Sequence, residues 1–462
     1  NDNINYLFYD NESQTEQVKD FSILPNKTYP ELGNPVLIEF TKEQIEQICA
    51  NQNLYLKIRY YTYSNVLSSV KVYSPSFNWT DYPLAYTDNE AIGTRACFPC
   101  QDTPGAKVTY KAELTAKSPL RIMASALKER EPVKQGKQYL KELIKDSPNY
   151  NQDKSNFKKS SQTEENSKEN QQSQEEAYIK YFYHTKIPFS TYLIVFAIGE
   201  IKEASLSPRC KVFSTERDLE KATLEYKYIE HYIAKAEKLL NVPYHWEEFN
   251  ILILPDYSYF GMENPYLVYI DRKFIAKKSL ILHELIHFWI GNLVTNKNWD
   301  CMWINEGITT YLEMKMVREI EGEEKAEEEI EFKLGSLKSV VEYKKETGQS
   351  LNNTTLATNF NHKDPGQCWG ELQYNKGVAF LKHIESLVGE KNVLLVLKAM
   401  VEENKCGVVG NEEVKDLFFR EFSRICIEDT SSGLFKDKFS GYDDLISKVN
   451  WNDWLYTPGY LG

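Results

Sequence analysis

The sequence lacks the long apolar runs, the leader segment and the basic surface that mark three classes of protein. No apolar run approaches the roughly 18 to 20 residues that a membrane-spanning helix needs. The N-terminus shows no basic region followed by an apolar one, so no signal peptide is visible. Acidic residues outnumber Lys and Arg, 67 to 55, and the net charge of -12 argues against a nucleic-acid-binding surface. We therefore expect a cytoplasmic monomer with neither a membrane nor a nucleic acid as partner.

The cysteines show no sign of a disulfide framework. The eight Cys are scattered along the chain and are not clustered as in a small disulfide-stabilised domain, so we expect reduced thiols. Cys97 and Cys100 have the spacing of some metal and redox sites. The sequence contains no second such pair for a zinc ribbon and no helix start after a βαβ strand. A plain structural role is therefore favoured for both.

The length of 462 residues predicts two or three domains. Residues 1–200 alternate strand-like runs with turns, which predicts a mostly β domain. Residues 146–177 consist almost entirely of Asn, Gln, Ser, Lys and Glu, and we expect a disordered surface insert there, since such a segment cannot bury enough apolar area to fold. The strand candidates are residues 35–40, 54–63, 107–115, 120–126, 178–184 and 190–199.

The period of the apolar residues changes after the β region. Residues 218–240 have helical spacing and predict one helix, and residues 249–254 predict a short buried strand. After about Gly322 the chain reads as largely helical, with acidic runs on solvated faces. We expect residues 201–455 to form a second, α/β domain, and residues 456–462 to be a short stub after it.

The run from His283 to His287 is a candidate metal-binding motif. Residues 278–291 read as one buried helix, and residues four apart lie on the same helix face, so His283 and His287 can point two imidazoles at one ion. A catalytic zinc takes three protein ligands and leaves one place for water. Glu306, separated from His287 by 18 intervening residues, supplies the third ligand, and Glu284 flanks the water. The sequence therefore predicts one Zn²⁺ per chain.

Glu313 extends this site. It lies seven residues after Glu306, about two turns along a second predicted helix and hence on the same face. It is therefore a candidate partner for a ligand His, fixing the tautomer of the ring. The alternative is a buried helix that carries two satisfied His by chance, which the position of the acidic residues disfavours.

With these residues in place, the sequence resembles the M1 zinc aminopeptidases. The resemblance rests on the run Gly261-Met262-Glu263-Asn264, on His283-Glu284-x-x-His287 and on Glu306. Residues 291–299 and 450–459 are similar to the leukotriene A4 hydrolase and aminopeptidase B branch of that family. The resemblance implies a multidomain β plus α/β fold: a β-saddle domain, a thermolysin-like catalytic domain and a C-terminal helical domain. We expect that last domain to be absent and the chain to be a partial or truncated product.

The resemblance also implies roles for the catalytic residues. Glu284 is the general base, taking a proton from water and delivering it to the leaving amine. Tyr374, in Gln373-Tyr-Asn-Lys-Gly377, is the donor beside the oxyanion. A buried packing Tyr is the alternative reading of that position.

Further residues match the family's substrate-binding positions. Glu263 corresponds to the anchor for the free α-amine, and Glu90, with Ala91 beside it, falls where the family places a second polar anchor. The loop amides near Gly261 and Met262 would pair with the substrate backbone, and Asn264 completes the loop. The expected partners are therefore peptides with a free N-terminal amine.

Three positions depart from the branch. Phe260 stands where the branch has another Gly and makes the loop bulkier, while Gly366 and Trp369 stand where it has an acidic residue and a Tyr. The missing acid argues against a lipid epoxide hydrolase activity. The main hypothesis is an aminopeptidase acting on short peptides. The alternatives are a bifunctional enzyme that also opens a lipid epoxide and a truncated, non-catalytic binding paralogue.

Overall fold

The computed structural model describes most of the chain. The segment 146–177, predicted to be disordered, lies outside the described residues except for Ala177, and Trp369 lies outside them as well. The described residues are 5–11, 14–18, 21–23, 36–38, 41–51, 55–60, 69–78, 80–135, 177–360, 364–367, 370–428 and 439–460.

The first part of the chain is rich in strands, as predicted. Its strands are β1 (Asn5–Asn11), β2 (Gln14–Val18), β3 (Phe21–Ile23), β4 (Val36–Ile38), β5 (Tyr55–Arg59), β6 (Val70–Tyr73), β7 (Leu84–Thr87), β8 (Lys107–Val108), β9 (Lys111–Lys117), β10 (Arg121–Ala124), β11 (Leu127–Gln135), β12 (Tyr178–His184), β13 (Phe189–Ser190) and β14 (Phe196–Gly199). Among the described residues of this part, three short helices lie between the strands: α1 (Lys42–Asn51), α2 (Pro75–Asn78) and α3 (Thr94–Cys97).

These strands form sheets in the orders β2-β1-β5, β3-β4, β10-β14-β7-β6, β11-β12-β9 and β13-β8. The pairs are antiparallel, so each sheet can bury one face and expose the other. Between β10 and β12, for example, Ile122 and Tyr181 belong to a small separate core. The prediction of one strand over residues 190–199 was wrong at its start: a 3₁₀ turn, η2 (Thr191–Leu193), precedes β14.

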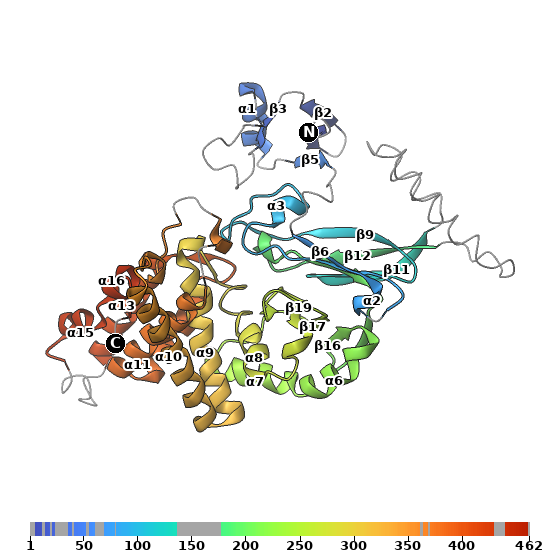
Figure 1. Cartoon of the computed structure of the whole chain (residues 1–462). Helices are drawn as coiled ribbons and strands as arrows, with labels where there is room; N and C mark the ends of the chain where they lie inside the picture. Colours follow the sequence, from blue (N-terminus) through green and yellow to red (C-terminus); the bar gives the residue numbers. More distant parts are fainter. Residues whose placement is uncertain are drawn as a thin grey trace.

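A five-stranded mixed sheet follows in the order β15-β16-β17-β19-β18. Its strands are β15 (Lys202–Ser205), β16 (Cys210–Ser214), β17 (Phe249–Leu254), β18 (Gly261–Met262) and β19 (Val268–Asp271). β17 pairs in parallel with both neighbours, and all six of its residues are buried, as expected for a parallel strand covered on both faces. In Figure 1 the strands β9, β11 and β12 lie above this sheet, and helices lie below it.

Two helices replace the single one predicted over residues 218–240. They are α6 (Glu216–Tyr226) and α7 (Ile229–Leu240), and the backbone N–H of Tyr232 donates to the carbonyl of Tyr228 at the start of the second. The buried positions Ala222, Tyr226, Ile229 and Ile233 keep helical spacing across the break. The spacing of the apolar residues therefore could not predict the break between α6 and α7.

The remaining elements are mainly helical, which confirms the prediction for the part after Gly322. The helices are α8 (Lys278–Ile286), α9 (Met302–Glu321), α10 (Glu323–Glu346), α11 (Glu371–Val388), α12 (Glu390–Glu403), α13 (Asn411–Glu428), α15 (Tyr442–Val449) and α16 (Trp451–Tyr456), and β20 (Thr295–Asn296) pairs with β21 (Val408–Val409). Short 3₁₀ turns η3 (Arg272–Phe274), η4 (Trp299–Cys301), η5 (Asn352–Thr354) and η6 (Pro365–Gln367) connect them.

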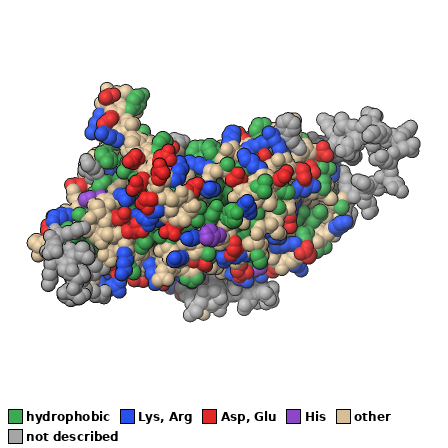
Figure 2. All heavy atoms as spheres, turned by 90° about the horizontal axis from the view of Figure 1, so that it is seen from below, with side chains coloured by type: hydrophobic (Ala, Val, Ile, Leu, Met, Phe, Trp, Pro, Cys, Tyr) green, Lys and Arg blue, Asp and Glu red, His purple; other side chains and the backbone are tan. Residues whose placement is uncertain are grey.

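The charged side chains of the surface and the two closely spaced cysteines can be located in the structure. Lys and Arg side chains alternate with Asp and Glu side chains over the face seen in Figure 2. Among the described residues, none of the helices has the length and apolar character needed to span a bilayer. Cys97 and Cys100 are both free and partly buried, and burial raises the pKa of their thiols to about 11 and about 12.

Candidate metal centre

The helix that carries the two His is shorter than predicted. We expected it to run over residues 278–291, but α8 ends at Ile286 and His287 lies at its C-cap. The chain then turns sharply, because Gly291 has φ = +121°, a conformation that side chains disfavour. A Cβ at Gly291 would also lie 2.8 Å from His287 Nδ1. The turn therefore wraps closely around the second His.

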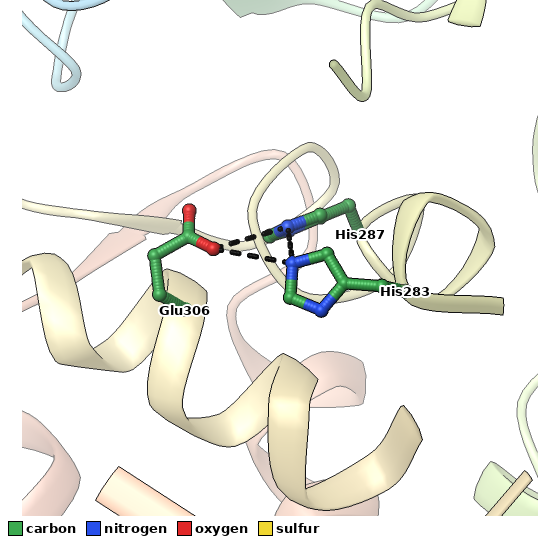
Figure 3. Close-up of side chains that lie close together, drawn as sticks. All are labelled: His283, His287 and Glu306. Atoms are coloured by element: carbon green, nitrogen blue, oxygen red, sulfur yellow. Dashed lines mark hydrogen bonds and ion pairs between the residues drawn. The ribbon is translucent and has the colours of Figure 1, made fainter. Parts of the chain in front are cut away.

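Three side chains converge at one point, as Figure 3 shows. His283 Nε2 lies 2.9 Å from His287 Nε2, and Glu306 Oε2, on the first turns of α9, lies 3.3 Å from each of them. Two ligands placed about 2.0–2.1 Å from a tetrahedral zinc are themselves about 3.3 Å apart. The two separations of Glu306 Oε2 equal this value, and the two imidazole nitrogens lie closer together than it. Two imidazole lone pairs at this distance repel each other unless a cation or a proton lies between them.

The outer nitrogens of both rings have partners that fix the tautomers. His283 Nδ1 lies 3.0 Å from Glu313 Oε2, and His287 Nδ1 lies 3.0 Å from the carbonyl of Ile290. An Nδ1–H that donates to an oxygen leaves the Nε2 lone pair free for a metal. The predicted position of Glu313 is therefore the observed one. No sequence pattern pointed to Thr309, whose hydroxyl lies 3.3 Å from His287 Nδ1 and donates to the carbonyl of Ile290.

Buried and partly buried carboxylates surround this group. Oxygens of Glu90, Glu263 and Glu306 lie within 4.8 Å of one another, and so do ligand atoms of Glu263, Glu284 and His287. Burial, followed by the charges of nearby glutamates, raises the pKa of Glu90 and keeps it well above its usual range. Burial also raises the pKa of Glu284 to about 8, although His283 and His287 oppose the shift. The structure thus brings the predicted anchors and the predicted base next to the metal ligands.

The loop before the site fits around Glu284. A Cβ at Gly261 would overlap the Glu284 carboxylate, so only glycine leaves room for it there. Gly261 and Met262 form β18, which pairs with β19, and Met262 is buried. Asn264 is fully buried and neither atom of its side-chain amide has a partner among the described residues. Ala91, next to Glu90, is buried as well.

Tyr374 reaches the site from α11. Its ring stacks on that of His283, with centroids 6.0 Å apart and an angle of 22° between the planes. Burial, followed by the charge of Glu306, keeps the pKa of its phenol well above the usual range. The phenol therefore stays protonated and can donate a hydrogen bond beside the metal ligands.

Comparison with known proteins agrees with this geometry. The model of the Peptidase M1 N-terminal domain matches residues 3–145, and that of the Peptidase family M1 domain matches residues 224–424. The chain belongs to the M1 peptidase family. Leucine aminopeptidase 2 of Neosartorya fischeri is 31% identical over 384 residues, and leukotriene A-4 hydrolase of Xenopus laevis is 30% identical over 385. Each match covers 82% of this chain and 53% of the relative, so the chain spans about half the length of these M1 proteins.

Solved structures of M1 proteins share the fold. Yeast leukotriene A4 hydrolase in complex with bestatin matches with a TM-score of 0.74 and 24% identity, over 96% of this chain and 60% of that one. The native enzyme from Saccharomyces cerevisiae gives a TM-score of 0.73 over 96% of this chain and 59% of that one. The predicted architecture, a β domain followed by an M1 catalytic domain, is thereby confirmed.

Proposed function

We propose that this M1 chain is a monomeric zinc aminopeptidase that removes N-terminal residues from short peptides. Residues 1–200 would form its β domain and residues 201–455 its catalytic domain. The observation that carries the proposal is the position of Glu263 and Glu90, whose carboxylates lie within 4.8 Å of Glu306. A carboxylate pair beside the metal ligands suits a substrate's free ammonium group and limits cleavage to the first peptide bond.

The remaining groups have the chemistry that hydrolysis requires. Zinc, held by His283, His287 and Glu306, would lower the pKa of a water and polarise the scissile carbonyl. Glu284 Oε2 is buried without a hydrogen-bond partner among the described residues, so it is free to accept a proton and pass it to the leaving amine. The Tyr374 hydroxyl donates to the developing oxyanion.

The Glu284→Gln variant tests the proposal. Glutamine keeps the size of the side chain but cannot accept the proton, so we expect zinc to be retained and kcat to fall by about a hundredfold or more. Zinc content and hydrolysis of amino acid amides should be measured on the same preparation. Glu324→Gln, at an exposed position in the first turn of α10, is the matched control and should change neither. Undiminished turnover of Glu284→Gln contradicts the role of Glu284, and no turnover by zinc-loaded wild type contradicts the proposed function.

A further inference from the structure

The turn after α8 joins the metal ligand to the amine anchor through a single residue, Asn292. Its backbone N–H donates to the carbonyl of His287 over 2.9 Å, and its side-chain amide donates to the carbonyl of Glu263 over 2.7 Å. Asn292 is fully buried, so neither bond competes with bulk water. Asn292 thus fixes the distance between the backbone of His287, a candidate metal ligand, and that of Glu263, the proposed anchor for the substrate's amine.

A lysine from the β region holds Asn292 from the other side. Lys107 of β8 donates from Nζ to the carbonyls of Asn292 and Leu293, over 3.0 and 2.9 Å. The same turn is closed within itself, where the N–H of Gly291 donates to Val294 over 2.7 Å. The backbone N–H, the carbonyl and the side-chain NH₂ of Asn292 are therefore each bonded to a different segment of the chain. This leaves the residue little freedom to move.

The carboxylate that this arrangement positions has a free oxygen. Glu263 is 4% exposed, and its Oε1 has no hydrogen-bond partner among the described residues. The hydrogen bond from Asn292 to the Glu263 carbonyl fixes where the side chain of Glu263 starts. A shift of the Glu263 backbone would move the carboxylate relative to the metal ligands and weaken its alignment with an ammonium group.

We propose that Asn292 is a positioning residue that sets Glu263 at a fixed place relative to His287, and that Lys107 fixes Asn292 in turn. This inference rests on the proposed aminopeptidase function. It predicts that loss of the Asn292 side chain weakens recognition of the substrate's free amine and leaves the metal ligands intact. A merely structural role predicts instead an equal loss for ligands with and without the amine.

The test compares Asn292→Ala with wild type, using two inhibitors that differ only in the amine: leucine hydroxamate and 4-methylpentanohydroxamic acid. We expect the KM for an amino acid amide and the Ki of leucine hydroxamate to rise about tenfold, the effect of losing one buried hydrogen bond of about 1.4 kcal/mol. The kcat, the zinc content and the Ki of the amine-free hydroxamate should stay unchanged.

Asn296→Ala is the matched control. Asn296 is also fully buried in the same segment, but its side-chain amide donates to the carbonyl of Asn298 and not to the Glu263 loop. This variant should leave both inhibition constants unchanged. If Asn292→Ala does not fold, Lys107→Met tests the same turn, because it removes the two hydrogen bonds that the turn receives from β8. This variant should also weaken the binding of leucine hydroxamate and not that of the amine-free hydroxamate.

Two results for Asn292→Ala overturn the inference: an equal loss of affinity for both inhibitors, or no loss of affinity for either. Where Asn292→Ala does not fold, the same two results for Lys107→Met overturn it. The same selective effect in Asn296→Ala also overturns it. Failure of the proposed function gives a different result, a zinc-loaded wild type that cleaves no amino acid amide. In that case calorimetric binding of the two hydroxamates still decides whether Asn292 controls recognition of the amine.

Discussion

Gly307 on α9 and Gly377 on α11 bring the two helices into backbone contact. A Cβ built at Gly307 would lie only 2.8 Å from the Cα of Gly377. Gly307 follows the metal-ligand candidate Glu306, and Gly377 lies three residues after Tyr374. The close approach of two residues without side chains therefore sets how near the phenol comes to the metal ligands.

Replacing Gly377 by alanine should reverse the usual effect of this substitution. Gly→Ala in a helix interior normally stabilises by about 0.5–1 kcal/mol. Here the new methyl group would collide with the α9 backbone, so we expect lower stability, and a fall in kcat as Tyr374 moves away. Gly335→Ala in α10 is the control, because nothing lies within 4 Å of a Cβ there and it should stabilise. Chemical denaturation and amide hydrolysis measure both effects. A stabilised, fully active Gly377→Ala protein contradicts this view.

Glu313 should matter for metal affinity although it is not a ligand. Its carboxylate accepts from His283 Nδ1, and an amide in its place is a weaker acceptor. We expect Glu313→Gln to weaken zinc binding about 10- to 100-fold, as measured by competition with a chromogenic chelator. Glu319→Gln, on the same helix but paired near the surface with Lys235, should bind zinc like wild type. Equal affinities of the two variants would show that the contact does not tune the metal site.

Local spacing was enough to predict that the candidate metal ligands lie close together. His283 and His287 are one helical turn apart, and Glu306 and Glu313 are two turns apart on a helix that the structure confirms as α9. The assignment of Tyr374, Glu263 and Glu90 to the site came from the family resemblance, and the structure places all three near the ligands. Their catalytic and binding roles stay predictions.

Contacts between distant segments could not be read from the sequence. Asn292 reaches Glu263 across 29 residues, and which strand carries Lys107 to the turn depends on the packing of two sheets. The end of α8 was missed because the residues around His287 are all apolar and buried, so the hydrophobic pattern continues past the last helical turn. Gly291 was the one local signal of that end.

Lys376 provides a test of stability against pH. Its side chain is fully buried, and Nζ donates to the carbonyls of Thr354 and Thr457 over 2.9 and 2.8 Å. Burial lowers the pKa of the Lys376 ammonium from 10.5 to about 8. Between these two values the unfolded chain binds a proton that the folded protein has released, so the free energy of unfolding rises with pH, by at most about 1.4 kcal/mol per unit. Urea titrations from pH 8 to 10 should therefore show wild type gaining stability relative to Lys376→Met. Lys338→Met, at an exposed position on α10, is the control, and wild type should gain no stability relative to it. If the free energies of unfolding of wild type and Lys376→Met change with pH in parallel, the buried amine keeps its proton.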